Sequence, residues 1–493
     1  MATASTVVLF AEYSLQAMQL DDVFLQHKLV LVAFLWCAVV AVFAYFSRWR
    51  RHPVLLLDYS CYKPDDEQKM SYEASEYFIR RSRRYNSTSE EFMRAIYLKS
   101  GLGDETYAPP FLFGRGDATH ASGVQEAEAG MYTAVDALLS KTRVDASQID
   151  VLVAACSMFT PCPSLTSLLV RRYGCRPSVK TFNLSGMGCS AGAIAVDMAA
   201  GVLRRKPGYA LVVTMESTSV NWYYGDDRSM LVTNCIFRVG TAAMLLTSDP
   251  ARRAGSKLEL VRSLRTHHGA DDASHGAAVQ REDEAGAVGV ALSKDLVRVA
   301  GAGLREHIRA LAPSVLPLSE LLRYAGAVAA SAVAQRIPGG GAAKGDGGHA
   351  AAAAGGNVPD FTKAFEHMCF HPGGKAVINA LGRLLRLPEW VVEPARMTLH
   401  RFGNTSSSSV VYELGYLEAK GRIRRGDRVW MLAFGTGFKA CSLVWRATRD
   451  STLDCDNPWV DSIYAYPVPT ATARPHPSST ASGAIARRHH STS

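Results

Sequence analysis

Cys189 differs from the other cysteines of the chain in the residues that surround it. In residues 181–192, TFNLSGMGCSAG, an apolar stretch runs into Gly186 and Gly188 just before it, and an Ala-rich segment, 190–206, follows it and ends in cations. This pattern predicts a strand, a tight turn and a helix that begins at Cys189. The positive end of the helix dipole favours a thiolate, so we expect a lowered thiol pKa and a nucleophile for covalent catalysis. A buried structural cysteine is the alternative on this segment alone.

Two later side chains have the chemistry to assist a thiolate. His371 stands at the end of an apolar stretch in residues 366–374, EHMCFHPGG, and the carboxyl ends of strands are where α/β sites usually lie. Asn404 follows Gly403 and precedes a hydroxyl-rich run that opens a predicted helix, 408–420. A side-chain amide at this place can cap a helix, and it can also donate hydrogen bonds to a developing oxyanion.

A metal site is a second interpretation of the same histidine segment. His367, Cys369 and His371 alternate along the predicted strand and would share one face of it. No fourth ligand stands at a suitable spacing, so the sequence predicts no metal site. The ten cysteines form no CxxC pair, which excludes a zinc-ribbon framework and a disulfide-dense secreted scaffold.

The elements that must position these residues alternate between strand and helix patterns. Short apolar runs are bounded by Gly, Pro or charge and have helical patterns between them, which predicts an α/β fold of βαβ units with buried parallel strands. The runs are residues 150–155, 179–184, 209–214, 241–247, 365–370, 429–434 and 440–445. The run at 429–434 leads into a loop with Gly435 and Gly437, whose backbone can approach a thioester closely.

Length and charge narrow the function classes. The chain has 493 residues, of which 48% are hydrophobic and 20% charged, so it can bury a large core and is not mostly disordered. Its net charge is 54 − 45 = +9, but no basic run is interleaved with aromatic residues, so we expect no nucleic-acid partner. The excess of positive charge fits a membrane protein that faces an anionic leaflet, or an enzyme that binds anionic substrates.

The N-terminal region predicts a membrane anchor. Residues 29–46, LVLVAFLWCAVVAVFAYF, carry no charge, and as a helix they would extend ~27 Å, close to the hydrocarbon thickness of a bilayer. The cluster Arg48, Arg50 and Arg51 follows in place of a cleavage site, which indicates an uncleaved anchor with the large C-terminal part in the cytosol. The weaker stretch 6–20 is an interfacial helix or a degraded second span. A buried helix of a soluble protein is the alternative for 29–46.

Four motifs together carry a family resemblance. NLSGMGCSAG, FHPGGKAVINALG, HRFGNTSSSSVVYELGY and AFGTGFKACS are similar to motifs of the condensing enzymes of the thiolase-like superfamily. The nearest resemblance is to plant 3-ketoacyl-CoA synthases, the condensing component of the very-long-chain fatty acid elongase, and it runs from about residue 54 to 446. Chalcone synthase-type polyketide synthases resemble the chain less closely. The resemblance implies a layered αβαβα fold of two similar halves.

The resemblance also assigns roles. It implies that Cys189 accepts the acyl group from a long-chain acyl-CoA, and that His371 and Asn404 promote decarboxylation of malonyl-CoA. The product would be a 3-oxoacyl-CoA two carbons longer, with CO2 and CoA released and with no cofactor and no metal. The family groups three further histidines with its active site, and they match His267, His367 and His400.

Composition and the resemblance together set the expected domain boundaries, and composition alone predicts the low-complexity loop and the disorder of the Pro- and Ser-rich tail. The predicted parts are a membrane anchor, 1–52; a half that carries the nucleophile, 53–265; a connecting segment, 266–357, with a low-complexity loop at 338–357; a second half, 358–448; and a disordered tail, 449–493.

The family implies a location and partners as well. We expect the endoplasmic reticulum membrane with the catalytic part in the cytosol, contact with membrane lipid, association with the other elongase enzymes (the reductases and the dehydratase), and a homodimer by analogy. Two alternatives remain open here: a chalcone synthase-type polyketide synthase, and an inactive scaffold subunit of the elongase. The first is disfavoured by the predicted anchor, and the second by the intact set of Cys189, His371 and Asn404.

Overall fold

The structure, a computed structural model, separates the chain into two compact units, residues 1–52 and 53–493. The residues that it describes are 31–37, 39–40, 52–114, 118–334 and 358–469. Part of the predicted span 29–46 lies outside this set. The whole of the predicted loop 338–357 and residues 470–493 of the predicted tail also lie outside it. Within the described part of the chain, no helix has both the length and the apolar character needed to cross a bilayer.

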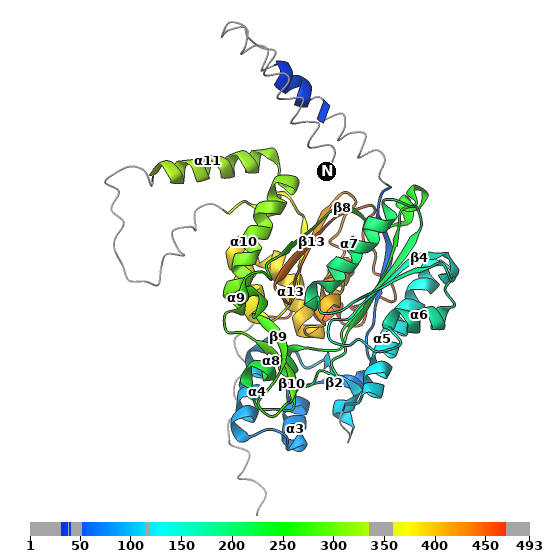
Figure 1. The fold of residues 1–493 in the computed structure, drawn as a ribbon, viewed down its shortest axis with the longest axis vertical. Coiled ribbons are helices and arrows are strands. Elements are labelled where there is room, and N and C mark those ends of the chain that lie inside the picture. The colour runs from blue at the N-terminus through cyan, green and yellow to red at the C-terminus, as the bar shows by residue number, and fades with distance from the viewer. Residues whose placement is uncertain (1–30, 38, 41–51, 115–117, 335–357, 470–493) are drawn as a thin grey trace, which may run out of the picture. The chain divides into compact units, whose positions relative to one another are not determined.

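Nine strands of the second unit form one sheet, in the order β11-β12-β13-β8-β1-β7-β6-β4-β5 (Figure 1). Their bounds are β1 Leu55–Cys61, β4 Ile149–Ala155, β5 Lys180–Leu184, β6 Tyr209–Met215, β7 Thr241–Thr247, β8 Leu258–His267, β11 His367–Phe370, β12 Arg428–Gly435 and β13 Lys439–Ala447. Parallel pairing is confirmed for β4 with β5 and β6, and for β11 with β12. The prediction of parallel strands is wrong for β7 and β13, which run antiparallel to their neighbours. Only residues 436–438 connect β12 to β13, which is too short for a crossover.

The sequence did not predict β1 and β8, and these two strands join the halves of the sheet. Leu55 and Leu56 of β1 pair with Glu259 and Leu258 of β8, and along its other edge β1 pairs with β7. β1 begins with a short apolar run, residues 54–57, and the residues that follow it are polar and charged, so no strand pattern stands out there. Its position in the middle of the sheet is set by pairing with strands far away in sequence.

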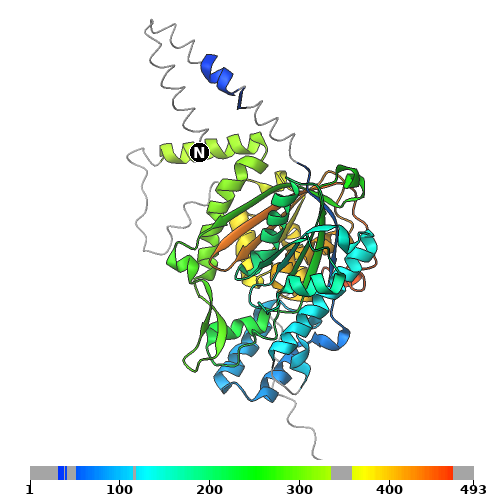
Figure 2. The ribbon, with the colours of Figure 1, turned by 45° about the vertical axis from the view of Figure 1, so that its right-hand side comes forward.

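Helices cover both faces of the sheet and also lie between its halves (Figures 1 and 2). The outer helices are α5 His120–Thr142 and α6 Leu165–Tyr173 against the half with β4, and α10 Leu296–Val315, α12 Lys375–Leu385 and α13 Glu389–Phe402 against the half with β11. The inner helices are α7 Ala191–Leu203 and α14 Ser409–Ala419, each of which contacts strands of both halves. A helix buried all round needs small or apolar residues on every face, and α7 consists of them apart from one aspartate.

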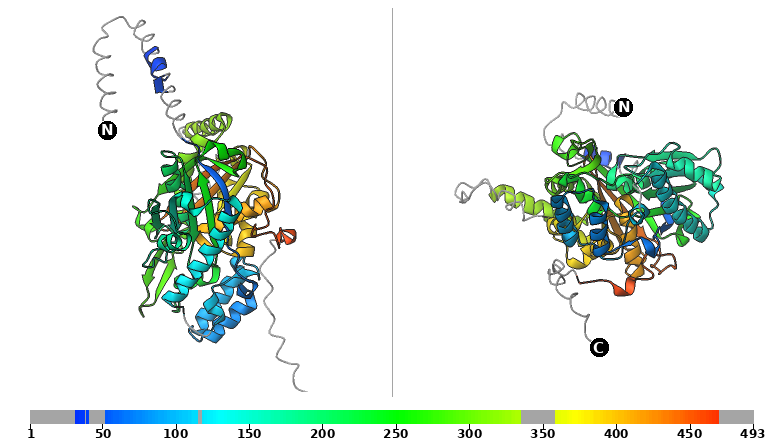
Figure 3. Two further views of the ribbon diagram at one scale, coloured as in Figure 1. Left: turned by 90° about the vertical axis from the view of Figure 1, so that its right-hand side faces the viewer. Right: turned by 90° about the horizontal axis from the view of Figure 1, so that it is seen from below.

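One helix, α11 Leu318–Ala334, follows α10 and lies at one end of the unit (Figure 1). The remaining elements gather at the opposite end, toward which the parallel strands point (Figure 3). They are α3 Tyr72–Ser82, α4 Ser87–Ser100, α8 Arg228–Ile236, α9 Asp272–His275, β9 Ala278–Glu282, β10 Val288–Leu292, and β2 Lys69–Met70 with β3 Thr106–Tyr107. This end is where an α/β fold is expected to carry its site.

The predicted disorder of residues 449–493 is wrong for 449–469, which pack against the second half. Trp459 is fully buried, and its indole N–H donates a hydrogen bond to the carbonyl oxygen of Tyr412 at 2.8 Å. A Pro- and Ser-rich tail suggests disorder by composition, but one large aromatic residue buries enough apolar surface to order the segment around it.

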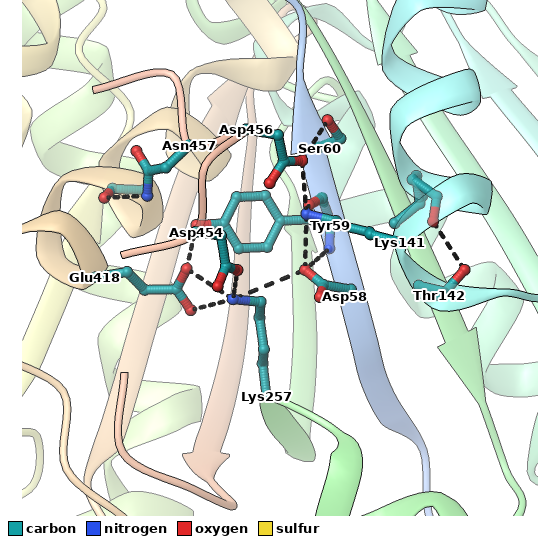
Figure 4. A network of polar contacts seen from close by, with 12 residues as sticks. Asp58, Tyr59, Ser60, Lys141, Thr142, Lys257, Glu418, Asp454, Asp456 and Asn457 are labelled. Carbon is teal, nitrogen blue, oxygen red and sulfur yellow. Dashed lines mark hydrogen bonds and ion pairs between the residues drawn. The ribbon is translucent and has the colours of Figure 1, made fainter. Parts of the chain in front are cut away.

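Buried and partly buried ion pairs hold the same segment (Figure 4). The Lys257 ammonium, with a side chain only 4% exposed, lies 2.7 Å from Asp454 and 3.1 Å from Glu418 of α14. The Lys141 ammonium of α5 lies 2.8 Å from Asp456. Removing one partner of a buried pair leaves an uncompensated charge, so these contacts tie the C-terminal segment to the sheet and to α14.

We expect Trp459→Ala to lower the free energy of unfolding by about 3–5 kcal/mol, because it removes a fully buried aromatic ring that packs on Phe402 and Tyr416. Chemical denaturation of the purified chain measures this. Tyr464→Ala is the matched control, since that ring is 85% exposed and its loss should change stability by less than about 0.5 kcal/mol. Equal stability of the two variants would show that the segment does not pack as described.

Candidate active site

A cavity of about 460 Å³ lies at the carboxyl ends of the parallel strands. Six of the eight residues that the sequence singled out line it: Cys189, His267, His371, Asn404, Gly435 and Gly437. They come from both halves of the sheet, so the fold brings together positions up to about 250 residues apart in sequence.

Cys189 stands in a single 3-10 turn, Gly188–Ser190, which runs directly into α7. Gly188 has a φ of 62°, and a Cβ atom placed on it would lie 2.5 Å from the backbone nitrogen of Thr436. A Cβ on Gly435 would lie 2.2 Å from the Ser190 hydroxyl. Both glycines are therefore required by the close approach of the 435–437 loop to the nucleophile turn.

The expectation of a lowered thiol pKa is wrong for the free protein. Cys189 is partly exposed to the cavity, but protein surrounds the sulfur, and this burial raises the pKa of the thiol to about 12. A hydrogen bond from the Ser406 hydroxyl at 3.5 Å favours the thiolate, and the Glu216 carboxyl opposes it. The effect of burial on the thiol pKa is larger than the effect of the helix dipole, so a base must take the proton when the sulfur attacks.

His371 is a candidate for this base, because it lines the same cavity as Cys189. Its backbone N–H donates to the carbonyl oxygen of Leu432 at 2.9 Å, which fixes the residue at the end of β11. Burial lowers the pKa of the imidazole to about 4, so the ring is neutral near pH 7. Its Nδ1 has no hydrogen-bond partner among the described residues. A neutral imidazole offers one acceptor and one N–H donor, so it can take a proton from a thiol or donate to an oxyanion.

Asn404 is held so that its amide N–H groups remain as donors. Its backbone N–H donates to Ile236 at 3.1 Å, and its carbonyl oxygen accepts from the N–H of Arg238 at 2.9 Å. The side-chain oxygen accepts from the backbone N–H of Ser406 at 2.9 Å. Because the oxygen is used within the turn, the chemistry that the amide can offer a ligand is donation from nitrogen. Asn404 can therefore cap the turn with its side-chain oxygen and donate hydrogen bonds to an oxyanion with its side-chain nitrogen, the two roles that the sequence suggested.

Glu216 and Ser406 are cavity residues that sequence reasoning missed. The buried carboxyl of Glu216 accepts hydrogen bonds from the backbone N–H groups of Ser157 and Met158, at 3.1 and 2.9 Å, and burial raises its pKa. The Ser406 hydroxyl lies 3.4 Å from this carboxyl and 3.5 Å from the Cys189 sulfur. Ser406 also has a φ of 54°, a rare conformation for a residue other than glycine. The signal for Glu216 was its place directly after β6.

The other three histidines do not share one location. His267 ends β8 and lines the cavity, and burial together with Lys439 lowers its pKa. His367 begins β11, and its Nε2 lies 2.9 Å from the Asp427 carboxylate.

The predicted grouping brings six residues together at the cavity, but His367 and His400 are not among the residues that line it. His367 and His371 are four residues apart on an extended strand, which separates them by about 13 Å. His400 lies in the last turn of α13, where its Nδ1 is 2.9 Å from the hydroxyl of Tyr466. In the described ranges, no three metal-ligating side chains come together.

A buried carboxyl lies behind His371. Glu413 of α14 accepts the backbone N–H of Phe370 at 2.8 Å, and this N–H is on the free side of β11, the edge strand of the sheet. Its other oxygen has no partner among the described side chains and backbone groups. Burial raises the pKa of Glu413 well above its usual value, so ionisation of this group opposes folding.

We expect Glu413→Gln to make the protein more stable than wild type at alkaline pH. The wild-type group has its full stabilising effect below its unfolded pKa and loses it as pH rises through the raised folded pKa, so the difference should grow by up to about 1.4 kcal/mol per pH unit. Thermal unfolding between pH 5 and 9 measures this. Glu284→Gln, at an exposed position, should show no such trend, and parallel curves for both variants would contradict the assignment.

The geometry supports acyl transfer followed by stabilisation of a carbanion. Among the residues that line the cavity, a thiol can act as a nucleophile, a neutral imidazole can act as a base, and the Asn404 amide can donate hydrogen bonds. Thiol nucleophiles of this kind form thioesters with acyl donors, and the donor set suits an enolate oxygen.

Sequence comparison finds relatives over nearly all of the chain. Residues 45–333 match a family model described as FAE1/Type III polyketide synthase-like protein, and residues 362–447 match 3-oxoacyl-[acyl-carrier-protein (ACP)] synthase III C terminal. 3-ketoacyl-CoA synthase 11 of Arabidopsis thaliana is 44% identical over 90% of this chain and 85% of its own. Probable 3-ketoacyl-CoA synthase 20 of Oryza sativa subsp. japonica is 44% identical over 89% of this chain and 82% of its own.

Solved structures share the fold at low identity. A fungal type III polyketide synthase aligns with a TM-score of 0.59 at 17% identity, over 80% of this chain and 99% of its own. A polyketide synthase from the brown alga Ectocarpus siliculosus aligns with a TM-score of 0.62 at 16% identity, over 80% and 99%. These likenesses confirm the predicted thiolase-like α/β fold.

Proposed function

The chain belongs to the 3-ketoacyl-CoA synthase family, and from this we propose that it joins malonyl-CoA to a long-chain acyl-CoA with loss of CO2. The product is a 3-oxoacyl-CoA two carbons longer, which is the first step of very-long-chain fatty acid elongation. The observation that carries the proposal is that Cys189, His371 and Asn404 line one cavity.

The first half of the reaction transfers the acyl group to Cys189. The thiol gives its proton to the neutral His371 imidazole, and the sulfur attacks the carbonyl carbon of the acyl-CoA. The new bond joins the Cys189 sulfur to the acyl carbon, and the bond from that carbon to the CoA sulfur breaks. CoA leaves with the proton that His371 held, so the imidazole is neutral again.

The second half forms the carbon–carbon bond. The bond between malonyl-CoA and its carboxylate breaks, CO2 leaves, and the electron pair forms an enolate whose oxygen accepts hydrogen bonds from His371 and Asn404. The enolate carbon attacks the acyl carbon, with backbone N–H groups of the 435–437 loop near the second oxyanion. The bond to the Cys189 sulfur breaks, and the sulfur takes up a proton from solvent.

This chemistry requires no cofactor, so we propose that acyl-CoA and malonyl-CoA are the only small molecules involved. The thioester itself is the electrophile, and decarboxylation supplies the driving force. A chalcone synthase-type activity is less supported, because the relatives at 44% identity are 3-ketoacyl-CoA synthases, whereas the similarity to the polyketide synthase structures shows the fold alone.

The proposed activity is tested with the purified full-length chain, radiolabelled malonyl-CoA and saturated acyl-CoAs from palmitoyl-CoA upward. We expect label in a 3-oxoacyl-CoA that has gained one two-carbon unit, identified by mass spectrometry after reduction of the keto group. Products that contain several malonyl-derived units would support a polyketide synthase instead. Absence of any labelled product would support a scaffold subunit.

We propose that residues 29–46 anchor the protein in the endoplasmic reticulum membrane and leave residues 53–493 in the cytosol, because an arginine cluster follows the apolar segment. Long acyl chains partition into lipid, so a site held at the membrane surface suits this substrate. Protease added to intact microsomes should degrade the folded unit, and its protection would contradict this topology.

The proposed partners follow from the product and from the edge of the sheet. A 3-oxoacyl-CoA must be reduced and dehydrated before another round, so we propose association with the reductases and the dehydratase of the elongase, tested by co-purification from microsomes.

We also propose a homodimer, because β5 is an edge strand with exposed residues, and such edges pair with other chains. A monomer in light scattering would contradict the dimer.

A further inference from the structure

The residues that line the cavity at Cys189 differ in their exposure to solvent. Thr233, Ile236 and Val290, which come from α8 and β10, are buried. His275 of α9, which also lines the cavity, is exposed. An apolar chain gains free energy for each methylene that leaves water, so a tethered acyl group should extend toward the buried residues of α8 and β10.

A second, much smaller cavity is lined in part by residues of α8 and β10, two elements that are labelled in Figure 1. The two cavities share four lining residues, Met158, Thr233, Phe237 and Val290, so they are adjacent. The second cavity has a volume of about 20 Å³, which is room for only one or two water molecules. Trp222 lies on its lining but does not reach the main cavity.

Trp222 is held by contacts on its other side. Its indole N–H donates to the hydroxyl of Tyr85 at 3.0 Å, and that hydroxyl donates to the carbonyl oxygen of Tyr223 at 3.0 Å. The rings of Phe78 and Phe111 pack against the indole edge to face, with centroid distances of 5.6 and 5.9 Å. The indole therefore cannot swing aside without losing a hydrogen bond and two aromatic contacts.

We infer that Trp222 closes the far end of the acyl-binding cavity and sets the longest acyl chain that Cys189 accepts. The inference rests on the proposed function, because it assumes that the cavity holds an acyl chain. A chain that passes Phe237 and Met158 meets the second cavity, which has room for one or two water molecules, and then the indole. Methylenes beyond that point find no room, so longer acyl-CoAs should be excluded.

The test measures acylation of Cys189 alone. The full-length protein is incubated with saturated acyl-CoAs from palmitoyl-CoA upward, without malonyl-CoA, and the acyl-Cys189 peptide is quantified by mass spectrometry. Trp222→Ala should move the longest accepted chain up by at least two carbons and raise acylation by the first excluded acyl-CoA about tenfold or more. Trp222→Phe, which keeps most of the ring, should give a smaller shift.

Trp390→Ala is the matched control, because this tryptophan is 51% exposed on α13 and does not line the cavity. Its chain-length limit should equal that of the wild type. If Trp222→Ala does not fold, as judged by thermal unfolding, Trp222→Leu takes its place. An unchanged limit in a folded Trp222→Ala or Trp222→Leu protein would overturn the inference.

The outcomes separate this inference from the proposed function. Acylation that shifts with Trp222 but gives no product when malonyl-CoA is added would refute the condensation and support the role of Trp222. Condensation with an unchanged chain-length limit would refute the role of Trp222 alone. No acylation of Cys189 by any acyl-CoA would overturn both.

Discussion

Cys189→Ala is expected to abolish condensation, with a loss of about 10⁴-fold or more in the rate of 3-oxoacyl-CoA formation. Alanine has the small size that the turn tolerates but no atom to carry the acyl group, so the reaction loses its covalent intermediate. The assay is incorporation of radiolabelled malonyl-CoA by the purified variant, with palmitoyl-CoA as the acyl donor. Cys441→Ala is the matched control, since that buried thiol is not among the residues that line the cavity. Unchanged incorporation by Cys189→Ala would refute the nucleophile assignment.

Cys189→Gln adds a sharper version of the same test. A glutamine side chain resembles the acylated cysteine, so this variant should not condense but should still release CO2 from malonyl-CoA if His371 and Asn404 perform that step. Complete loss of CO2 release in a folded Cys189→Gln protein would count against the division of roles between the thiol and the two donors.

Asn404→Ala and His371→Ala are expected to lower the rate of malonyl-CoA decarboxylation by about 10²–10³-fold each, which corresponds to about 3–4 kcal/mol of oxyanion stabilisation per donor. The Asn404 amide is held by its hydrogen bond to Ser406, and the neutral His371 ring is fixed at the end of β11. Both side chains can therefore donate without reorganisation. CO2 release measured in the Cys189→Gln background isolates this step from acylation.

The two donors should differ in their effect on acylation. Asn404→Ala should still form acyl-Cys189, because the amide acts on the enolate, whereas His371→Ala should also slow acylation, because it removes the base for a thiol whose pKa is about 12. His367→Gln is the control, since that ring pairs with Asp427 outside the cavity. A loss of decarboxylation with His367→Gln as large as with His371→Ala would contradict the site.

The local sequence was sufficient to predict where strands, turns and helices begin and end, because these depend on residues that are close in the chain. The glycines and small residues around Cys189 specified a strand, turn and helix there, and the Pro-Gly-Gly after His371 specified the end of a strand. These features could be predicted because a few adjacent residues fix the backbone conformation. The same holds for most of the strands of the sheet, whose apolar runs are short and sharply bounded.

Contacts between distant segments decided the rest. His367 and His371 read alike in sequence, but only His371 reaches the cavity, because the two stand at opposite ends of β11. Glu216 became part of the site through Ser406, 190 residues away in the chain. β1 became a central strand by pairing with β7 and β8, and the C-terminal segment became ordered around Trp459.

The thiol of Cys189 shows the physical reason most directly. Its position at a helix start follows from the local sequence, and that position alone favours the thiolate. Its pKa is raised because residues from elsewhere in the chain enclose the sulfur. Backbone conformation depends on adjacent residues, whereas burial and proximity depend on the whole packed chain, so the sequence alone indicated the nucleophile but not its protonation state.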